Sequence, residues 1–88
     1  MLMTALALCQ VLLFEQAGCA SCKASYRELS KYPNLKVEVY DMVKNRELAK
    51  SHRVIGAPTL VFLRKGEEIG RVYGYMPSLI KSLAEKCS

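Results

Sequence analysis

The stretch Cys19-Ala20-Ser21-Cys22 places two thiols three residues apart. Residues at this spacing lie on one face of a helical turn, within range of the roughly 4.4–6.8 Å between Cα atoms that a disulfide needs. The apolar run 11–14 before the stretch predicts a buried strand, and residues 23–32 after it predict a helix. The cysteine pair is therefore predicted at a junction where a strand turns, through Ala17 and Gly18, into a helix.

The predicted position of Cys19 near the helix N-terminus favours its thiolate form. The first N–H groups of a helix have no partner within the helix, and the helix dipole is positive at this end. A cysteine in such a position can have a pKa lowered to roughly 3.5–7.5, which makes it a nucleophile at neutral pH. A strand–CxxC–helix unit therefore predicts redox chemistry, although CxxC is also half of many zinc sites.

The composition is that of one small globular domain, which we expect to cover residues 1–88. The chain is 51% hydrophobic and 24% charged, and a chain of this length is near the lower limit for an independent core. Its formal net charge is +5, but lysine and arginine are spread along the chain and form no basic run interleaved with aromatic side chains. We therefore expect no nucleic-acid binding, while the basic balance favours acidic partners.

The first 14 residues contain no charged side chain. A secretory signal needs a basic start and a small-residue cleavage site, and neither is visible. A membrane-spanning helix needs about 20 apolar residues, and Glu15 ends this run earlier. We expect residues 1–8 to be a disordered or loosely packed extension before an internal strand, and we expect no membrane association.

Predicted strands and helices alternate along the chain in the order β-α-β-α-β-β-α, which is typical of an α/β fold. Strands are predicted at 9–15, 35–40, 59–63 and 69–73, and helices from the cysteine pair to about 32, from 46 to about 52, and from 77 onward. Cys22, Tyr26 and Leu29 mark the expected buried face of the first helix. Asn45 is the expected N-cap of the second helix.

Cys9 and Cys87 occupy apolar positions in the first strand and the last helix. Four cysteines are compatible with two structural disulfides of a secreted miniprotein, or with one reactive pair and two ordinary buried thiols. The strong apolar periodicity favours the second alternative. We therefore expect Cys9 and Cys87 to be free thiols in the core.

Taken together, these motifs resemble the thioredoxin-like family. The similar segments are 11–14, Cys19-Ala20-Ser21-Cys22-Lys23, 47–49, Val54-Ile55-Gly56-Ala57-Pro58-Thr59-Leu60, and 62–67 followed by Gly74. The resemblance runs from about residue 9 to the end of the chain. It implies a minimal thioredoxin-like fold, a four-stranded mixed sheet with three helices, without the extra N-terminal strand and helix of full-length thioredoxins.

The resemblance also implies roles for four residues. Cys19 would attack a substrate disulfide, and Cys22 would resolve the mixed disulfide. Pro58 would be the cis-proline beside the cysteine pair, leaving the backbone of Ala57 free for an extended substrate segment; the plain structural alternative is a proline at the start of a strand. The implied protein is a cytoplasmic, monomeric reductase of protein disulfides. Its electrons would come from a thioredoxin-reductase-like or other thiol donor, with no cofactor beyond its own redox-active disulfide.

The chain departs from the family pattern around the cysteine pair. Leu13 stands where thioredoxins have a buried aspartate, and Gly18 stands where they usually have tryptophan. Glu15 is a candidate proton acceptor in place of the missing aspartate, and its alternative is a solvated strand-end carboxylate. His52 is expected to pack or to cap a helix.

Two alternative functions remain open. A glutaredoxin-like protein is one, although Gly56-Ala57-Pro58 and the lone Gly74 differ from the Thr-Val-Pro and Gly-Gly motifs that glutaredoxins usually carry. A metal- or iron–sulfur-binding module is the other, with Cys19 and Cys22 as ligands together with Cys9 or Cys87. The usual second CxxC or histidine pair is absent from the sequence, so we expect no bound metal.

Overall fold

The computed structural model describes residues 9–87. Their elements are β1 (Cys9–Glu15), α1 (Ala20–Leu29), β2 (Leu35–Asp41), α2 (Arg46–Ser51), β3 (Thr59–Arg64), β4 (Glu67–Tyr73) and α3 (Pro77–Glu85). The predicted α/β element order is confirmed. The predicted N-terminal extension, residues 1–8, lies outside the described part of the chain.

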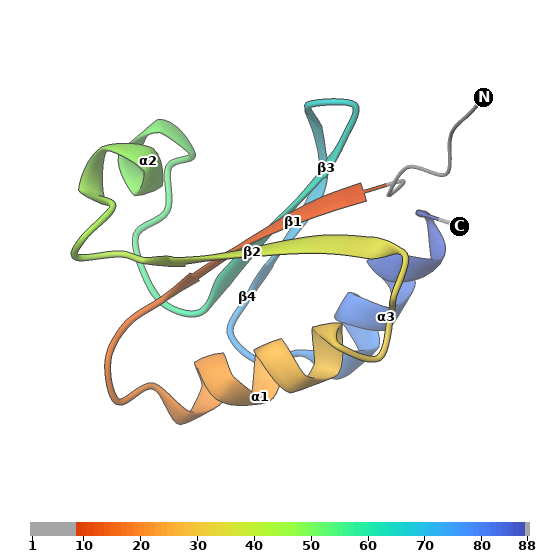
Figure 1. The fold of residues 1–88 in the computed structure, drawn as a ribbon, viewed down its shortest axis with the longest axis horizontal. Coiled ribbons are helices and arrows are strands. Elements are labelled where there is room, and N and C mark those ends of the chain that lie inside the picture. Colours follow the sequence, from red (N-terminus) through yellow and green to blue (C-terminus); the bar gives the residue numbers. More distant parts are fainter. Residues whose placement is uncertain (1–8, 88) are drawn as a thin grey trace.

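The strands form one mixed sheet in the order β2-β1-β3-β4 (Figure 1). β1 is parallel to β2 and antiparallel to β3, so that Val11 lies opposite both Val37 and Phe62. A parallel pair requires a crossover connection, which α1 supplies. β3 and β4 form a hairpin whose turn residues Lys65 and Gly66 have positive φ angles of 53° and 83°. β1 is therefore an interior strand, and everything attached to its ends is held by two neighbouring strands.

Helices cover both faces of the sheet, with α1 and α3 on one face and α2 on the other (Figure 1). Successive residues of a strand point to opposite faces. In β1, Val11 and Leu13 therefore join the core on the α1 and α3 side, while Leu12 and Phe14 join the core on the α2 side. This explains why β1 is apolar at nearly every position.

One helix boundary and one capping contact differ from those predicted. α1 ends at Leu29 rather than near residue 32, because the chain continues through turns in which the N–H of Tyr32 donates to the carbonyl of Leu29. Asn45 does precede α2, but its side chain makes no capping hydrogen bond. The Asn45 amide instead donates to the carbonyl oxygen of Asp41 over 3.0 Å.

The prediction that Tyr26 lies on the buried face of α1 was wrong. Its side chain is 49% exposed, whereas Cys22, Ser25 and Leu29 are buried. At 3.6 residues per turn, Tyr26 lies about 40° to one side of Cys22, while Ser25 and Leu29 lie on the other side. Tyr26 consequently faces the gap between α1 and β2 rather than the centre of the sheet.

The prediction that Cys9 and Cys87 are free thiols was also wrong. They form a disulfide with Cα atoms 5.6 Å apart, across a sequence separation of 78 residues. Both are buried, as predicted. Cys87 was predicted to lie in the last helix, but it follows α3, which ends at Glu85. Apolar periodicity shows which face each residue points to, but not that the start of β1 meets the segment after α3.

Polar side chains join β1 to β2 on the face that α2 covers. Gln10 Nε2 donates to one carboxylate oxygen of Glu38 over 2.8 Å, and the Tyr40 hydroxyl donates to the other over 2.7 Å. These hydrogen bonds lower the pKa of Glu38, and the bond to Glu38 raises the pKa of Tyr40. Glu38 is therefore held as a carboxylate between the two strands.

Within residues 9–87, none of the helices is both long enough and apolar enough to cross a bilayer.

Candidate redox site

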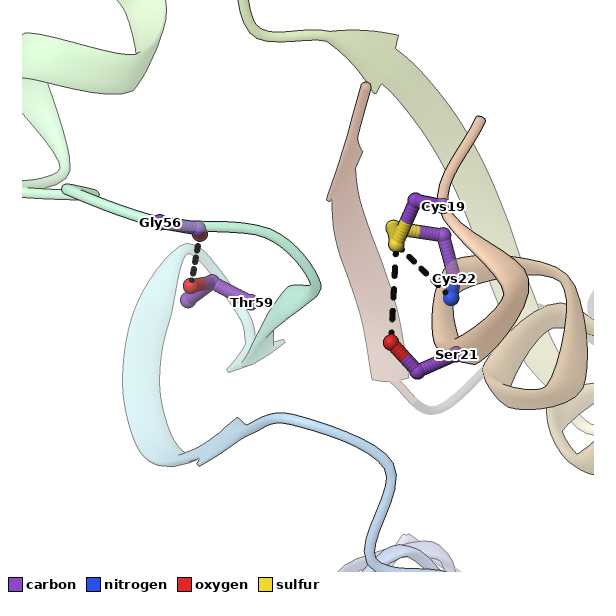
Figure 2. The surroundings of a disulfide bond; sticks show 5 residues. All are labelled: Cys19, Ser21, Cys22, Gly56 and Thr59. Atoms are coloured by element: carbon purple, nitrogen blue, oxygen red, sulfur yellow. Dashed lines mark hydrogen bonds between the residues drawn. A yellow bond between two sulfur atoms is a disulfide. The ribbon is translucent and has the colours of Figure 1, made fainter. Parts of the chain in front are cut away.

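The sheet brings the cysteine pair and the proline segment to the same end of the molecule. β1 ends at Glu15, and Cys19 follows after a turn in which Gly18 has a φ of 77°. β3 begins at Thr59, directly opposite Phe14 near the end of β1. Figure 2 shows the segment from Gly56 to Thr59 and the cysteine pair in one view of this end. Two segments separated by almost forty residues are thus placed together by the antiparallel pairing of β1 and β3.

Cys19 and Cys22 form a disulfide with Cα atoms 5.2 Å apart (Figure 2). Cys19 is the N-cap of α1, with an extended backbone. Its Sγ accepts a hydrogen bond from the N–H of Cys22 over 3.0 Å, and the Ser21 hydroxyl lies 3.5 Å from the same sulfur. The Cys19 sulfur therefore takes the place of the oxygen of an ordinary N-cap side chain.

The two cysteines differ in accessibility. Cys19 is half-buried, whereas Cys22 is 1% exposed. In the reduced state, the helix N–H groups and dipole favour negative charge on the Cys19 sulfur. Such a pair suits thiol–disulfide exchange, in which the accessible thiolate attacks a disulfide and the buried thiol then resolves the mixed disulfide.

The Ala57–Pro58 peptide bond is cis, as the sequence predicts. The Pro58 carbonyl accepts a hydrogen bond from the N–H of Gly74 over 2.8 Å, and the Thr59 hydroxyl donates to the carbonyl of Gly56 over 2.6 Å. Among the residues that the structure describes, neither the N–H nor the carbonyl of Ala57 has a hydrogen-bond partner. Pro58 is buried and Ala57 is half-buried, so the segment is anchored on both sides of an unpaired peptide group.

Glu15 is the last residue of β1, four residues before Cys19, and makes no hydrogen bond with the cysteine pair. Its side chain lines a groove of about 420 Å³ together with Lys23, Tyr26, Arg27 and Val39. Its backbone carbonyl accepts from the N–H of Met42 over 2.8 Å, which fixes the end of β1. Glu15 as a proton acceptor stays a prediction. The groove was not predicted from the sequence, in which its only signal is the cationic pair at positions 23 and 27, one helical turn apart.

His52 packs against the ring of Phe14, with ring centroids 6.1 Å apart, as its predicted packing role requires. The nearby Arg71 guanidinium makes two 2.7 Å hydrogen bonds to the Glu68 carboxylate. This contact raises the pKa of Arg71 and lowers that of Glu68. The Arg71 cation is therefore already neutralised by its own strand.

The positions of the four cysteines contradict a shared metal site. Cys9 and Cys87 are bonded to each other at the start of β1, whereas Cys19 follows its end. A strand of seven residues spans about 20 Å at about 3.3 Å per residue, and zinc requires every thiolate within about 2.3 Å of the ion. The described residues contain no other cluster of three or more potential ligands.

Comparisons with known proteins agree with this architecture. A family model for a thioredoxin-like domain matches residues 7–83. Thioredoxin H7 of Arabidopsis thaliana is 35% identical over 80 residues, which cover 85% of this chain and 62% of that protein. The chain thus spans less than two thirds of that relative's length. The SPbeta prophage-derived thioredoxin-like protein YosR of Bacillus subtilis is 28% identical over 78 residues, covering 88% of this chain and 96% of the relative.

Solved structures give the same result. The oxidized form of mitochondrial thioredoxin 3 from Saccharomyces cerevisiae superposes with a TM-score of 0.80 and 25% identity, over 90% of this chain and 78% of that one. Thioredoxin from Trypanosoma brucei brucei gives a TM-score of 0.79 and 26% identity, over 93% and 76% of the two chains. The predicted minimal fold is confirmed.

Proposed function

The chain belongs to the thioredoxin-like family, and on this premise we propose that it is a thiol–disulfide oxidoreductase that reduces protein disulfides through Cys19 and Cys22. The observation that carries the proposal is the contrast between the two sulfurs. Cys19 is accessible and its sulfur accepts a helix N–H, whereas Cys22 is buried three residues later. The proposal therefore assigns Cys19 as the attacking thiol and Cys22 as the resolving thiol.

The exchange proceeds in two displacements. The Cys19 thiolate attacks one substrate sulfur, the substrate S–S bond breaks, and the departing substrate sulfur takes up a proton. Cys22 then loses its proton and attacks the Cys19 sulfur of the mixed disulfide. This releases the second substrate thiol and forms the Cys19–Cys22 disulfide. Two electrons pass from the protein to the substrate, so an external thiol donor, of the thioredoxin-reductase type or another, must reduce the pair again.

The backbone of Ala57 supports a polypeptide substrate. Its N–H and carbonyl have no partner within residues 9–87, and an extended segment can pair with such groups as an added strand does. Pro58 holds this peptide at the same end of the sheet as the cysteine pair. We assign Ala57 and Pro58 to substrate binding and leave Glu15 as the candidate acceptor for the proton of Cys22.

The expected cytoplasmic location stays a prediction. The Cys9–Cys87 disulfide argues in the other direction, because structural disulfides are typical of oxidising compartments. The monomeric state likewise stays a prediction.

The proposal is tested by the single-turnover reduction of a disulfide-bonded peptide by the reduced protein. Wild type should convert one equivalent of peptide, and Cys19→Ser should convert none. Serine is a preferred N-cap, so Cys19→Ser keeps the capping position of α1 and should remain folded by circular dichroism. A folded Cys19→Ser variant that reduces the peptide at the wild-type rate would contradict the proposal.

A further inference from the structure

An open groove lies between α1 and β2, at residues that flank the cysteine pair in the sequence. We call it the α1–β2 groove; it has a volume of about 420 Å³ and its walls are Glu15, Lys23, Tyr26, Arg27 and Val39. Three of these residues come from one side of α1, where positions spaced by three and four lie next to each other. Val39 comes from β2, which is an edge strand of the sheet.

The groove lies next to the cysteine pair along the chain, although neither cysteine lines it. Lys23 directly follows Cys22, and Glu15 is the last residue of β1 before the turn to Cys19. A polypeptide whose sulfur reaches Cys19 can therefore place the residues beside that sulfur in the groove. The groove is reached from the β2 side of the cysteine pair, whereas the unpaired Ala57 peptide precedes β3 on the other side of β1.

The apolar part of the groove lining is accessible to solvent. Tyr26 is 49% exposed and Val39 is 41% exposed. An aromatic side chain and a β-branched side chain that line the same open groove can cover an apolar side chain of a partner, which removes the apolar surfaces of both proteins from water.

The rim of the groove carries unpaired positive charge. Lys23 and Arg27 are exposed, and the ion pairs among residues 9–87 involve other cations: Lys31, Lys36 and Arg71. Glu15 also lines the groove, so the formal charge of the lining is +1. An occupant that complements the groove therefore has a carboxylate next to an apolar side chain.

We propose that the α1–β2 groove selects one class of disulfide substrate. In this class, the residues beside the reactive cysteine include an apolar or aromatic residue and, next to it, an acidic residue. This inference rests on the proposed function, because it names the substrate class of the same site. Charge complementarity of this kind acts mainly on the association rate and on the choice of partner.

Two synthetic peptides test the proposal. Both carry the same disulfide and a phenylalanine beside the reactive cysteine, and they differ in having glutamate or lysine next to the phenylalanine. For the reduced wild-type protein, kcat/KM should be on the order of tenfold higher for the glutamate peptide. The double variant Lys23→Glu/Arg27→Glu should reverse this preference. Tyr26→Ala should lower kcat/KM for the glutamate peptide, because it removes the aromatic part of the groove lining.

The double variant Lys44→Glu/Lys81→Glu is the matched control, because it changes the net charge equally at exposed residues outside the groove. It should keep the wild-type preference. Equal rates for the two peptides with wild type, or the same loss of preference in both double variants, would overturn the proposal. So would a homodimer that Tyr26→Glu dissociates, because a second copy would then fill the groove. If the wild-type protein failed to reduce even a small uncharged aliphatic disulfide, the proposed function itself would be overturned.

Discussion

At the scale of single residues, Cys19 combines a structural and a chemical role. Its sulfur caps α1 by accepting the Cys22 N–H, and the same N–H would stabilise the thiolate that begins the exchange. The position of Cys19 near the helix N-terminus was predicted from the sequence, because a strand, a turn containing glycine and a helix meet at the CxxC motif, but the capping contact of its sulfur was not predicted. The accessibility difference between Cys19 and Cys22 follows from it, since Cys22 lies on the side of α1 that faces the sheet.

Glu15 and Cys87 show where prediction from single residues ends. The position of Glu15 at the end of β1 was predicted, but the direction of its side chain depends on the packing of α1 against β2. Cys87 was placed in an apolar position of the last helix, but its bond to Cys9 depends on which element lies beside that helix in space. Local patterns determine the face of an element, and contacts between distant elements decide the partner.

At the scale of elements, β1 organises the site, because the cysteine pair follows its end and β3, which follows Pro58, pairs with it. β1 was also predictable over its whole length. An uninterrupted apolar run predicts a strand covered on both faces, and β1 is such a strand from Cys9 to Glu15. α1 was predicted less accurately. Its periodicity identified Cys22 and Leu29 as buried, but a rotation of about 40° is enough to move Tyr26 from the core to the groove.

The link between β1 and β2 through Glu38 predicts a dependence of stability on pH. The pKa of Glu38 is lowered in the folded protein. The contribution of its carboxylate to the free energy of unfolding is therefore complete above the pKa of the unfolded chain, about 4.3. This contribution is lost as the pH falls through the lower pKa of the folded protein. We expect Glu38→Gln to reduce the free energy of unfolding by about 1 kcal/mol at pH 7, with the difference from wild type shrinking below about pH 4.

Urea unfolding of wild type and Glu38→Gln at a series of pH values measures this difference. Glu67→Gln is the control, because Glu67 is exposed in the β3–β4 hairpin and belongs to none of the ion pairs among residues 9–87. It should follow wild type at every pH. A difference between wild type and Glu38→Gln that is the same at pH 7 and in acid would show that the carboxylate is not held by Gln10 and Tyr40.

At the scale of the whole molecule, two disulfides of different kinds lie at opposite ends of β1. Cys19–Cys22 is partly accessible and closes a short loop, whereas Cys9–Cys87 is buried and joins residues 78 positions apart. A disulfide that closes a long loop restricts the unfolded chain far more than one that closes a short loop. A small domain with a limited core benefits most from such a link.

Removing each disulfide in turn tests this division of roles. In oxidised protein, Cys9→Ala/Cys87→Ala should lower the free energy of unfolding by about 2–5 kcal/mol, and Cys19→Ala/Cys22→Ala should lower it by clearly less. Denaturant titration measures both. Alkylation and mass spectrometry of folded protein after mild reduction should label only Cys19 and Cys22. An equal loss of unfolding free energy in the two double variants would contradict the structural role of the Cys9–Cys87 disulfide. Early labelling of Cys9 and Cys87 would contradict it as well.

The proposed function requires that the Cys19 sulfur attacks the substrate, and trapping of mixed disulfides identifies the attacking sulfur. Cys22→Ser and Cys19→Ser are each reduced, incubated with a disulfide-bonded peptide, and analysed by peptide mapping with mass spectrometry. We expect Cys22→Ser to accumulate a disulfide between Cys19 and the substrate sulfur, and folded Cys19→Ser to accumulate none. Trapping through Cys22 in Cys19→Ser, as fast as trapping through Cys19 in Cys22→Ser, would contradict this expectation.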